Sequence, residues 1–169
     1  YSSRIELKQK LRNVERLLTT AEKLGVLGNW LGKSTTEEKV WSAWEPSMFN
    51  QAHDLMAGVM TDHVYEDTIR GYDFSTRLGK EIVDERLDYL ASQVDTRGEG
   101  IPLVVFNSLG WQRDDVVETV IGFSKGGIID VQIVDQANRR IPVEIVEAER
   151  FRDGGLKNAK IIFIAREVP

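Results

Sequence analysis

Apolar residues in the first part of the chain recur every three or four positions, which is the spacing of amphipathic helices. The first such stripe consists of Leu7, Leu11, Val14, Leu18 and Ala21. It predicts a helix over residues 3–27, and Gly25 and Gly28 supply stop signals at its end. Charged side chains fill most of the other positions, so one face of this helix is expected to be buried and the other to be exposed to solvent.

A second helix is predicted from residues 35–36 onward, because Thr35 and Glu38 have the spacing of a capping box. Gly58 is expected to end it. Pro46 lies inside this helix and is expected to kink it, because proline removes one backbone hydrogen bond. The predicted helix has a broad apolar face, made of Val40, Trp41, Trp44, Met48, Phe49, Ala52 and Leu55. Spacing assigns both tryptophans to the core.

The longest helix is predicted over residues 62–94, with Thr61 as its N-cap. Its apolar stripe includes Tyr65, Ile69 and Tyr72. Three long helices joined by short loops predict an up-down-up bundle.

Near residues 95–100 the pattern changes from helical to alternating. Five strand candidates follow with no helix between them, at residues 102–107, 116–123, 129–134, 141–147 and 159–165. Residues 135–138 read as a hairpin loop, and consecutive strands predict antiparallel pairing. The predicted fold class is α+β, with a three-helix bundle in residues 1–97 and the first strands of an antiparallel β-sandwich in residues 98–169. Because five strands do not close a sandwich, more strands are expected beyond Pro169.

Composition narrows the classes of partner. The chain has 22 Lys and Arg against 27 Asp and Glu, a net charge of -5, with no basic run. This argues against a surface that tracks nucleic-acid phosphates. There is no cysteine, which excludes disulfides and Cys-ligated zinc and fits a cytoplasmic location. No apolar stretch approaches the roughly 20 residues of a membrane helix, so no membrane partner is expected.

Only two histidines are present, His53 and His63. On a continuous helix, spacings of three and four would place Asn50 beside both His53 and Asp54. This polar cluster has two interpretations, a solvent-facing strip or a functional site, and spacing alone favours the strip. His53 by itself cannot build a zinc site, because catalytic zinc takes at least three protein ligands. His63 is interpreted as a surface residue in the first turn of the third helix.

Three segments change this balance. They are Tyr1–Arg4 with Lys8, residues 15–18 and residues 21–22; Trp44–Asp54 with Gly58 and residues 64–67; and Val105–Val117. Read in order, they resemble the first bundle helix, the most recognisable downstream motif and the entry to the C-terminal β region of the α-mannosidases of glycoside hydrolase family 38. The segment Phe49-Asn50-Gln51-Ala52-His53-Asp54 is the most specific part of the resemblance.

The resemblance implies roles for two residues. His53 would be a ligand of the catalytic metal, zinc, and Asp54 would accept hydrogen bonds from the hydroxyls of a mannose substrate. The other metal ligands, the nucleophile and the acid/base would belong to an N-terminal α/β catalytic domain, so no catalytic residue is expected in this chain. In this family glycoside hydrolysis retains configuration through a covalent glycosyl-enzyme.

The resemblance therefore implies a fragment of a metal-dependent, retaining α-mannosidase that hydrolyses terminal α-mannosides, and we expect the isolated chain to be inactive. Its partners would be an α-mannoside, the N-terminal catalytic domain and the rest of the β region of the same parent protein. A homo-oligomer of the parent is left open. The alternatives are a non-catalytic carbohydrate-binding module and a structural module that bridges two domains.

Overall fold

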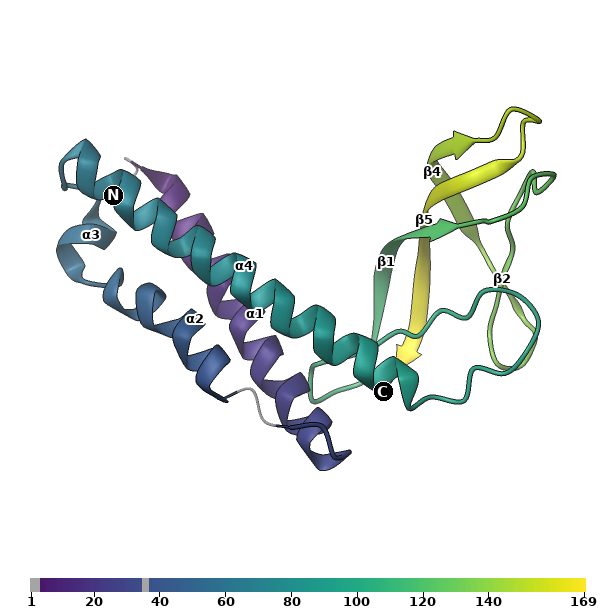
Figure 1. The fold of residues 1–169 in the computed structure, drawn as a ribbon, viewed down its shortest axis with the longest axis horizontal. Coiled ribbons are helices and arrows are strands. Elements are labelled where there is room, and N and C mark those ends of the chain that lie inside the picture. Colours follow the sequence, from purple (N-terminus) through teal and green to yellow (C-terminus); the bar gives the residue numbers. More distant parts are fainter. Residues whose placement is uncertain (1–3, 35–36) are drawn as a thin grey trace. The chain divides into compact units, whose positions relative to one another are not determined.

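The computed structural model describes residues 4–34 and 37–169. The chain divides into two compact units, residues 1–102 and residues 103–169. The helices belong to the first unit and the strands to the second (Figure 1). The fold class is therefore α+β with antiparallel sheets, as predicted. The expected domain boundary between residues 97 and 98 stays a prediction.

The helical unit is built around its two longest helices. Its elements are α1 (Ile5–Trp30), α2 (Glu37–Phe49), α3 (His53–Ala57) and α4 (Asp62–Ser92). Near the start of both long helices, Arg4, the residue before α1, pairs with Asp62 of α4 at 2.6 Å. Near their ends, the Tyr89 hydroxyl of α4 donates to the carbonyl of Leu31 at 2.7 Å. Because the start of α1 contacts the start of α4 and the end of α1 lies beside the end of α4, the two helices run parallel.

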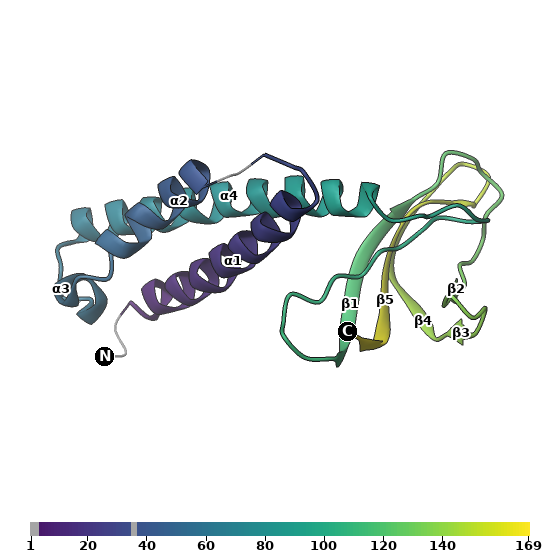
Figure 2. The same ribbon diagram turned by 90° about the horizontal axis from the view of Figure 1, so that it is seen from below.

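Helix α2 runs in the opposite direction to α4. Lys39, near the start of α2, pairs with Glu85 late in α4 at 3.8 Å. Asn50, just after α2, reaches the carbonyl of Thr68 early in α4 at 3.2 Å. The helices therefore form the predicted up-down-up arrangement, and the short helix α3 connects α2 back to the start of α4 (Figure 2).

The stripe predicted for α1 is confirmed: Leu7, Val14, Leu18 and Ala21 are buried, and Leu11 is half-buried against the core. The stop signals are wrong, because α1 continues to Trp30 and both of the glycines concerned are buried inside it. Buried glycines allow close approach of a neighbouring helix, and that use competes with their use as helix ends. A Cβ added at Gly28 would lie 2.9 Å from the guanidinium of Arg86 on α4.

The buried face of α2 keeps Val40 and the partly buried Trp44 of the predicted face but otherwise differs from it. Its buried side chains are Val40, Ala43 and Ser47, followed by Asn50 just after the helix. The large apolar residues Trp41, Met48 and Phe49 are exposed. Small side chains face α4 because they let the two helices pack closely, and this requirement outweighs hydrophobicity along the predicted stripe.

The predicted second helix is interrupted beyond Pro46, and the expected kink at this proline stays a prediction. Helix α2 includes Pro46 and ends at Phe49, and the amide of Asn50 still bonds the Pro46 carbonyl at 3.0 Å. The predicted helix to Gly58 is therefore two helices, α2 and α3. The Thr35 half of the predicted capping box lies outside the described residues. The third helix is confirmed, with α4 starting directly after Thr61.

The second unit holds two antiparallel sheets. One has the strand order β1-β5-β4, from β1 (Arg113–Gly122), β5 (Leu156–Val168) and β4 (Val143–Arg150), and the other pairs β2 (Ile133–Val134) with β3 (Arg140–Ile141). Alternate residues of β5 point into the core: Ala159, Ile161, Phe163 and Ala165. Ile133 and Ile141 pack against this core, so the β2–β3 pair covers one face of the larger sheet.

Some predicted strands are shortened or missing. Residues 102–107 form no strand, and only residues 133–134 of the stretch 129–134 pair. Pro142, which has no N–H to donate, separates β3 from β4 where one strand was predicted. The predicted hairpin loop at residues 135–138 is confirmed, since the Asp135 amide donates to the carbonyl of Arg139 at 3.0 Å.

Candidate functional site

The segment between α2 and α4 carries both residues singled out by the sequence. After Phe49 the chain makes one irregular turn and enters α3, whose first two residues are His53 and Asp54. Asn50 is therefore not on the same helix as these two residues, and the expectation of one continuous helix face is wrong. The expected exposure to solvent holds for His53 and Asp54 but not for Asn50. The break separates a buried amide from two exposed side chains.

Short-range backbone bonds hold α3 in place. The amides of Leu55 and Met56 both donate to the carbonyl of Ala52 at 3.0 Å, which closes the first turn of the helix. Gly58 ends α3 with φ of 77°, a left-handed conformation that favours glycine, and its amide bonds the Leu55 carbonyl at 3.1 Å. The glycine was correctly expected to end a helix, although that helix is only five residues long.

His53 and Asp54 lie side by side and face solvent. The imidazole Nε2 is 3.2 Å from a carboxylate oxygen of Asp54, and their side chains are 95% and 79% exposed. Neither side chain contributes to the core, so burial does not explain why the two residues are present. An exposed imidazole beside a carboxylate can bind a cation, donate to an acceptor, or accept hydrogen bonds from hydroxyl groups.

The residues just before this pair are anchored to α4. The side-chain amide of Asn50 donates to the carbonyl of Thr68 at 3.2 Å, and the Asn50 residue is only 6% exposed. The amide fits there because position 71 is glycine: a Cβ at Gly71 would lie 2.6 Å from Asn50 Nδ2. A buried amide that bonds a carbonyl fixes the end of α2 in one position.

Tyr72 of α4 contacts the segment on both sides of His53 and Asp54. Its hydroxyl lies 3.2 Å from the backbone oxygen of Asn50 and 3.5 Å from the sulfur of Met56. The sequence placed Tyr72 only in an apolar stripe and did not assign it this contact. The signal that could have found it is the glycine beside it, since glycine inside a helix suggests close approach of another segment.

Two observations bear on whether a metal fits here. Imidazole nitrogen and carboxylate oxygen are both zinc donors, so the chemistry of His53 and Asp54 suits this metal. Within residues 4–34 and 37–169, no group of three or more His, Asp or Glu side chains could hold a metal ion. The described residues therefore fit one corner of a metal site, and the other ligands would have to come from outside them.

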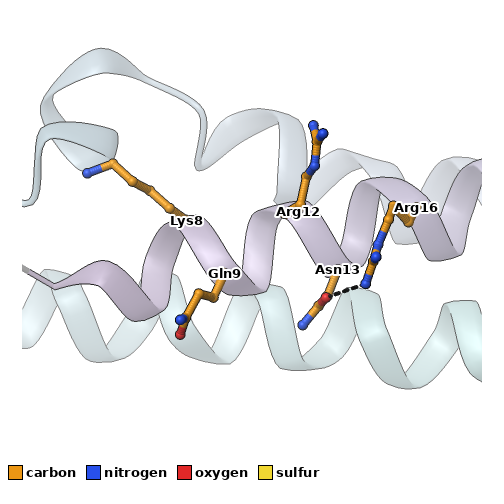
Figure 3. Close-up of a pocket in the computed structure, with 5 residues that line it drawn as sticks. All are labelled: Lys8, Gln9, Arg12, Asn13 and Arg16. Atoms are coloured by element: carbon orange, nitrogen blue, oxygen red, sulfur yellow. Dashed lines mark hydrogen bonds between the residues drawn. The ribbon is translucent and has the colours of Figure 1, made fainter.

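An open hollow lies elsewhere, along α1. It is lined by the polar side chains of Lys8, Gln9, Arg12, Asn13 and Arg16. Arg16 turns back along the helix and donates to the Asn13 side chain at 3.0 Å (Figure 3). All five residues come from one helix, and neither His53 nor Asp54 is among them, so this hollow is separate from the candidate site.

Comparison with known proteins shows which family the chain belongs to. The family described as the α-mannosidase middle domain matches residues 1–90. The chain belongs to this family, and the helical unit is the part that defines it. Comparison with curated proteins gave no match.

Two solved structures have the same fold over nearly the whole chain. An α-mannosidase from Enterococcus faecalis V583 is 20% identical with a TM-score of 0.75, over 97% of this chain. A glycosyl hydrolase family 38 protein from Enterococcus faecalis is 23% identical with a TM-score of 0.76, over 98%. The chain spans 22% and 23% of the lengths of these two proteins. The likeness covers both units, which shows that the sheet unit has the fold of the same proteins.

No helix within the described parts of the chain has the length and apolar character needed to cross a membrane.

Proposed function

We propose that this chain is the middle portion of a metal-dependent α-mannosidase, in which His53 supplies one zinc ligand and Asp54 binds the sugar. The observation that carries the proposal is the exposed His53-Asp54 pair, held at the start of a short helix in a member of the α-mannosidase middle-domain family. The two Enterococcus faecalis proteins, one of them an α-mannosidase, support the proposal because they have this fold across both units.

Each side chain suits its proposed role. The His53 imidazole is almost fully exposed, so one of its nitrogens can bind a zinc ion whose other ligands come from another part of the polypeptide. The Asp54 carboxylate is exposed beside it and can accept hydrogen bonds from two vicinal hydroxyls of a mannose ring. Bound zinc would supply positive charge that holds sugar oxygens in place.

The described residues supply only part of the groups that such an enzyme needs. One imidazole and its neighbouring carboxylate do not complete a metal site. The remaining ligands, the nucleophile and the acid/base would come from an N-terminal catalytic domain of the parent protein, which would hydrolyse terminal α-mannosides with retention of configuration. We therefore expect this chain alone to show no mannosidase turnover with added zinc.

The test uses the intact polypeptide that contains this chain. His53→Ala is expected to lower zinc content, measured by mass spectrometry of bound metal, and to reduce hydrolysis of a nitrophenyl α-mannoside at least about 100-fold. His63→Ala is the matched control, because His63 is an exposed histidine in the first turn of α4, ten residues away. This control is expected to keep both zinc and activity.

Asp54→Asn separates sugar binding from metal binding. It is expected to keep zinc while kcat/KM falls about 10- to 100-fold, since a hydrogen bond to a charged group contributes about 1.5–3 kcal/mol. Unchanged zinc content and activity in His53→Ala would contradict the proposal and favour a structural module. Mannose binding by this chain without metal would instead favour a carbohydrate-binding module.

A further inference from the structure

A single hydroxyl group connects α4 to both ends of the segment that presents His53 and Asp54. The Tyr72 hydroxyl is 3.2 Å from the Asn50 oxygen, three residues before His53, and 3.5 Å from the Met56 sulfur, three residues after it. A phenolic hydroxyl has one hydrogen, so it donates to one acceptor at a time. The backbone oxygen of Asn50 is the nearer and the stronger acceptor, and Met56 supplies a weaker contact.

This hydrogen bond is shielded from solvent. Tyr72 is fully buried, and Asn50 is buried with it. Burial raises the pKa of Tyr72 to about 12, and the negative charge of Glu15 acts in the same direction. The hydroxyl therefore keeps its proton, and remains a donor, at every pH at which such an enzyme would work.

Two hydrogen bonds in different directions fix Asn50 on α4. Asn50 contributes two bonds to α4, one from its side-chain amide to Thr68 and one accepted by its backbone oxygen from Tyr72. Gly71 leaves the space into which the amide fits. Because His53 follows only three residues later, a shift of Asn50 along α4 would move the start of α3 and the imidazole with it.

We propose that Tyr72 and Asn50 are positioning residues for His53, and that their contacts on α4 set where α3 presents the metal ligand. This inference rests on the proposed function for its consequence, the affinity for zinc. Its structural part, the anchoring of α3, does not depend on any metal. The two parts can therefore be tested separately on the same variants.

The test compares Tyr72→Phe with Ser75→Ala in the intact polypeptide. Ser75 is a matched control, because it is equally buried on α4 and its hydroxyl donates to the Gly71 carbonyl within the same helix at 3.1 Å, with no second acceptor among residues 4–34 and 37–169. In metal-free protein, Tyr72→Phe is expected to speed hydrogen exchange at the amides of Leu55 and Met56, which close the first turn of α3. Ser75→Ala is expected to leave that exchange unchanged.

The second readout is zinc affinity, measured by competition with a chelator at a temperature where all variants are folded. Tyr72→Phe is expected to weaken zinc binding about tenfold, in the range found for residues that orient metal ligands. Saturating zinc is expected to restore mannosidase activity, because the defect is one of position. Asn50→Ser is a second variant that removes the amide contact to Thr68, and it is expected to behave in the same way.

The outcomes distinguish the two proposals. If His53→Ala keeps its zinc, the proposed function fails, while hydrogen exchange still decides whether Tyr72 anchors α3. If His53→Ala loses zinc but Tyr72→Phe and Asn50→Ser match Ser75→Ala in exchange and in zinc affinity, the positioning role is overturned. If activity in Tyr72→Phe stays low at saturating zinc with the variant fully folded, the role assigned here is also wrong.

Discussion

The contact between Gly71 and Asn50 predicts that Gly71→Ala lowers the free energy of unfolding in the wild-type chain and raises it when the Asn50 side chain has been removed. In an ordinary helix, Gly→Ala stabilises by about 1 kcal/mol, because alanine loses less conformational entropy. At position 71 the new Cβ would lie 2.6 Å from Asn50 Nδ2. No real Cβ contact is that short, so the amide must leave its place beside the Thr68 carbonyl.

The magnitude follows from what the amide loses. A buried amide without a partner costs about 1–3 kcal/mol, which exceeds the gain in helix propensity. Gly71→Ala is therefore expected to lower the free energy of unfolding by about 1 kcal/mol. For a helical unit of roughly 100 residues, this lowers Tm by about 4–8 °C.

Removing the amide should reverse the effect. In an Asn50→Ala background the methyl group introduced by Gly71→Ala enters space that the amide has vacated, so this substitution is expected to raise the free energy of unfolding by about 1 kcal/mol. The double-mutant cycle should then give a coupling energy of about 2 kcal/mol. Thermal and urea unfolding of this chain, followed by the helical circular dichroism signal, measure all four proteins.

The control is Gly98→Ala, whose added Cβ would meet no atom within 4 Å. Its effect on stability is expected to be the same with and without Asn50. A Gly71→Ala effect of the same sign and size in both backgrounds would refute the reasoning. It would show that the contact with Asn50 does not limit the approach of α2 to α4.

Two further predictions concern buried polar groups of α4. The pKa of Tyr72 is raised to about 12. The stability that depends on its proton is therefore present below about pH 10, the usual tyrosine pKa, and is lost as pH rises towards 12. Urea midpoints should fall more steeply above pH 10 in the wild-type chain than in Tyr72→Phe, and equal slopes would contradict this prediction. Arg86 is fully buried, bonds the Ser34 carbonyl at 2.6 Å, and has Nε and Nη1 without partners in the described structure. Arg86→Met should therefore have a free energy of unfolding within about 1 kcal/mol of wild type, or a higher one. Arg86→Ala should lower the free energy of unfolding by about 2–4 kcal/mol, because it leaves a cavity. Equal losses for both variants in urea unfolding would show that the guanidinium itself is needed.

The helices of the bundle illustrate what periodicity can and cannot give. The stripe on α1 was predictable because a long helix buries one continuous face, and that face repeats in the sequence. Only part of the buried face of α4 was predicted: Tyr72 is buried as expected, but Thr68, Ser75, Gly79 and Arg86 are buried with it. Most of the buried face of α2 was not predictable, because α2 packs through small residues such as Ala43 and Ser47 and leaves Phe49 exposed. Hydrophobicity describes each residue alone, whereas close approach depends on both helices.

The sheet unit shows the same limit. Alternation located β5 and the antiparallel hairpins, because one face of each strand is buried. Alternation could not separate residues that pair from residues that merely pack: residues 102–107 form no ladder, although Val105 contacts the core. Pairing requires a neighbouring strand with free backbone groups, and such a neighbour is fixed only when the chain has folded.

By itself the sequence determined the fold class and the two long helices, because these depend on residue type and on local repeats. It singled out His53 and Asp54 through the family resemblance, since spacing alone favoured a solvent-facing strip. The tertiary structure decided the rest of the candidate site. It broke the predicted second helix after Phe49, buried Asn50 against α4, and brought Tyr72 to both sides of His53 and Asp54. These features arise from contacts between residues about 16–22 positions apart, and no pattern within one helix encodes such contacts.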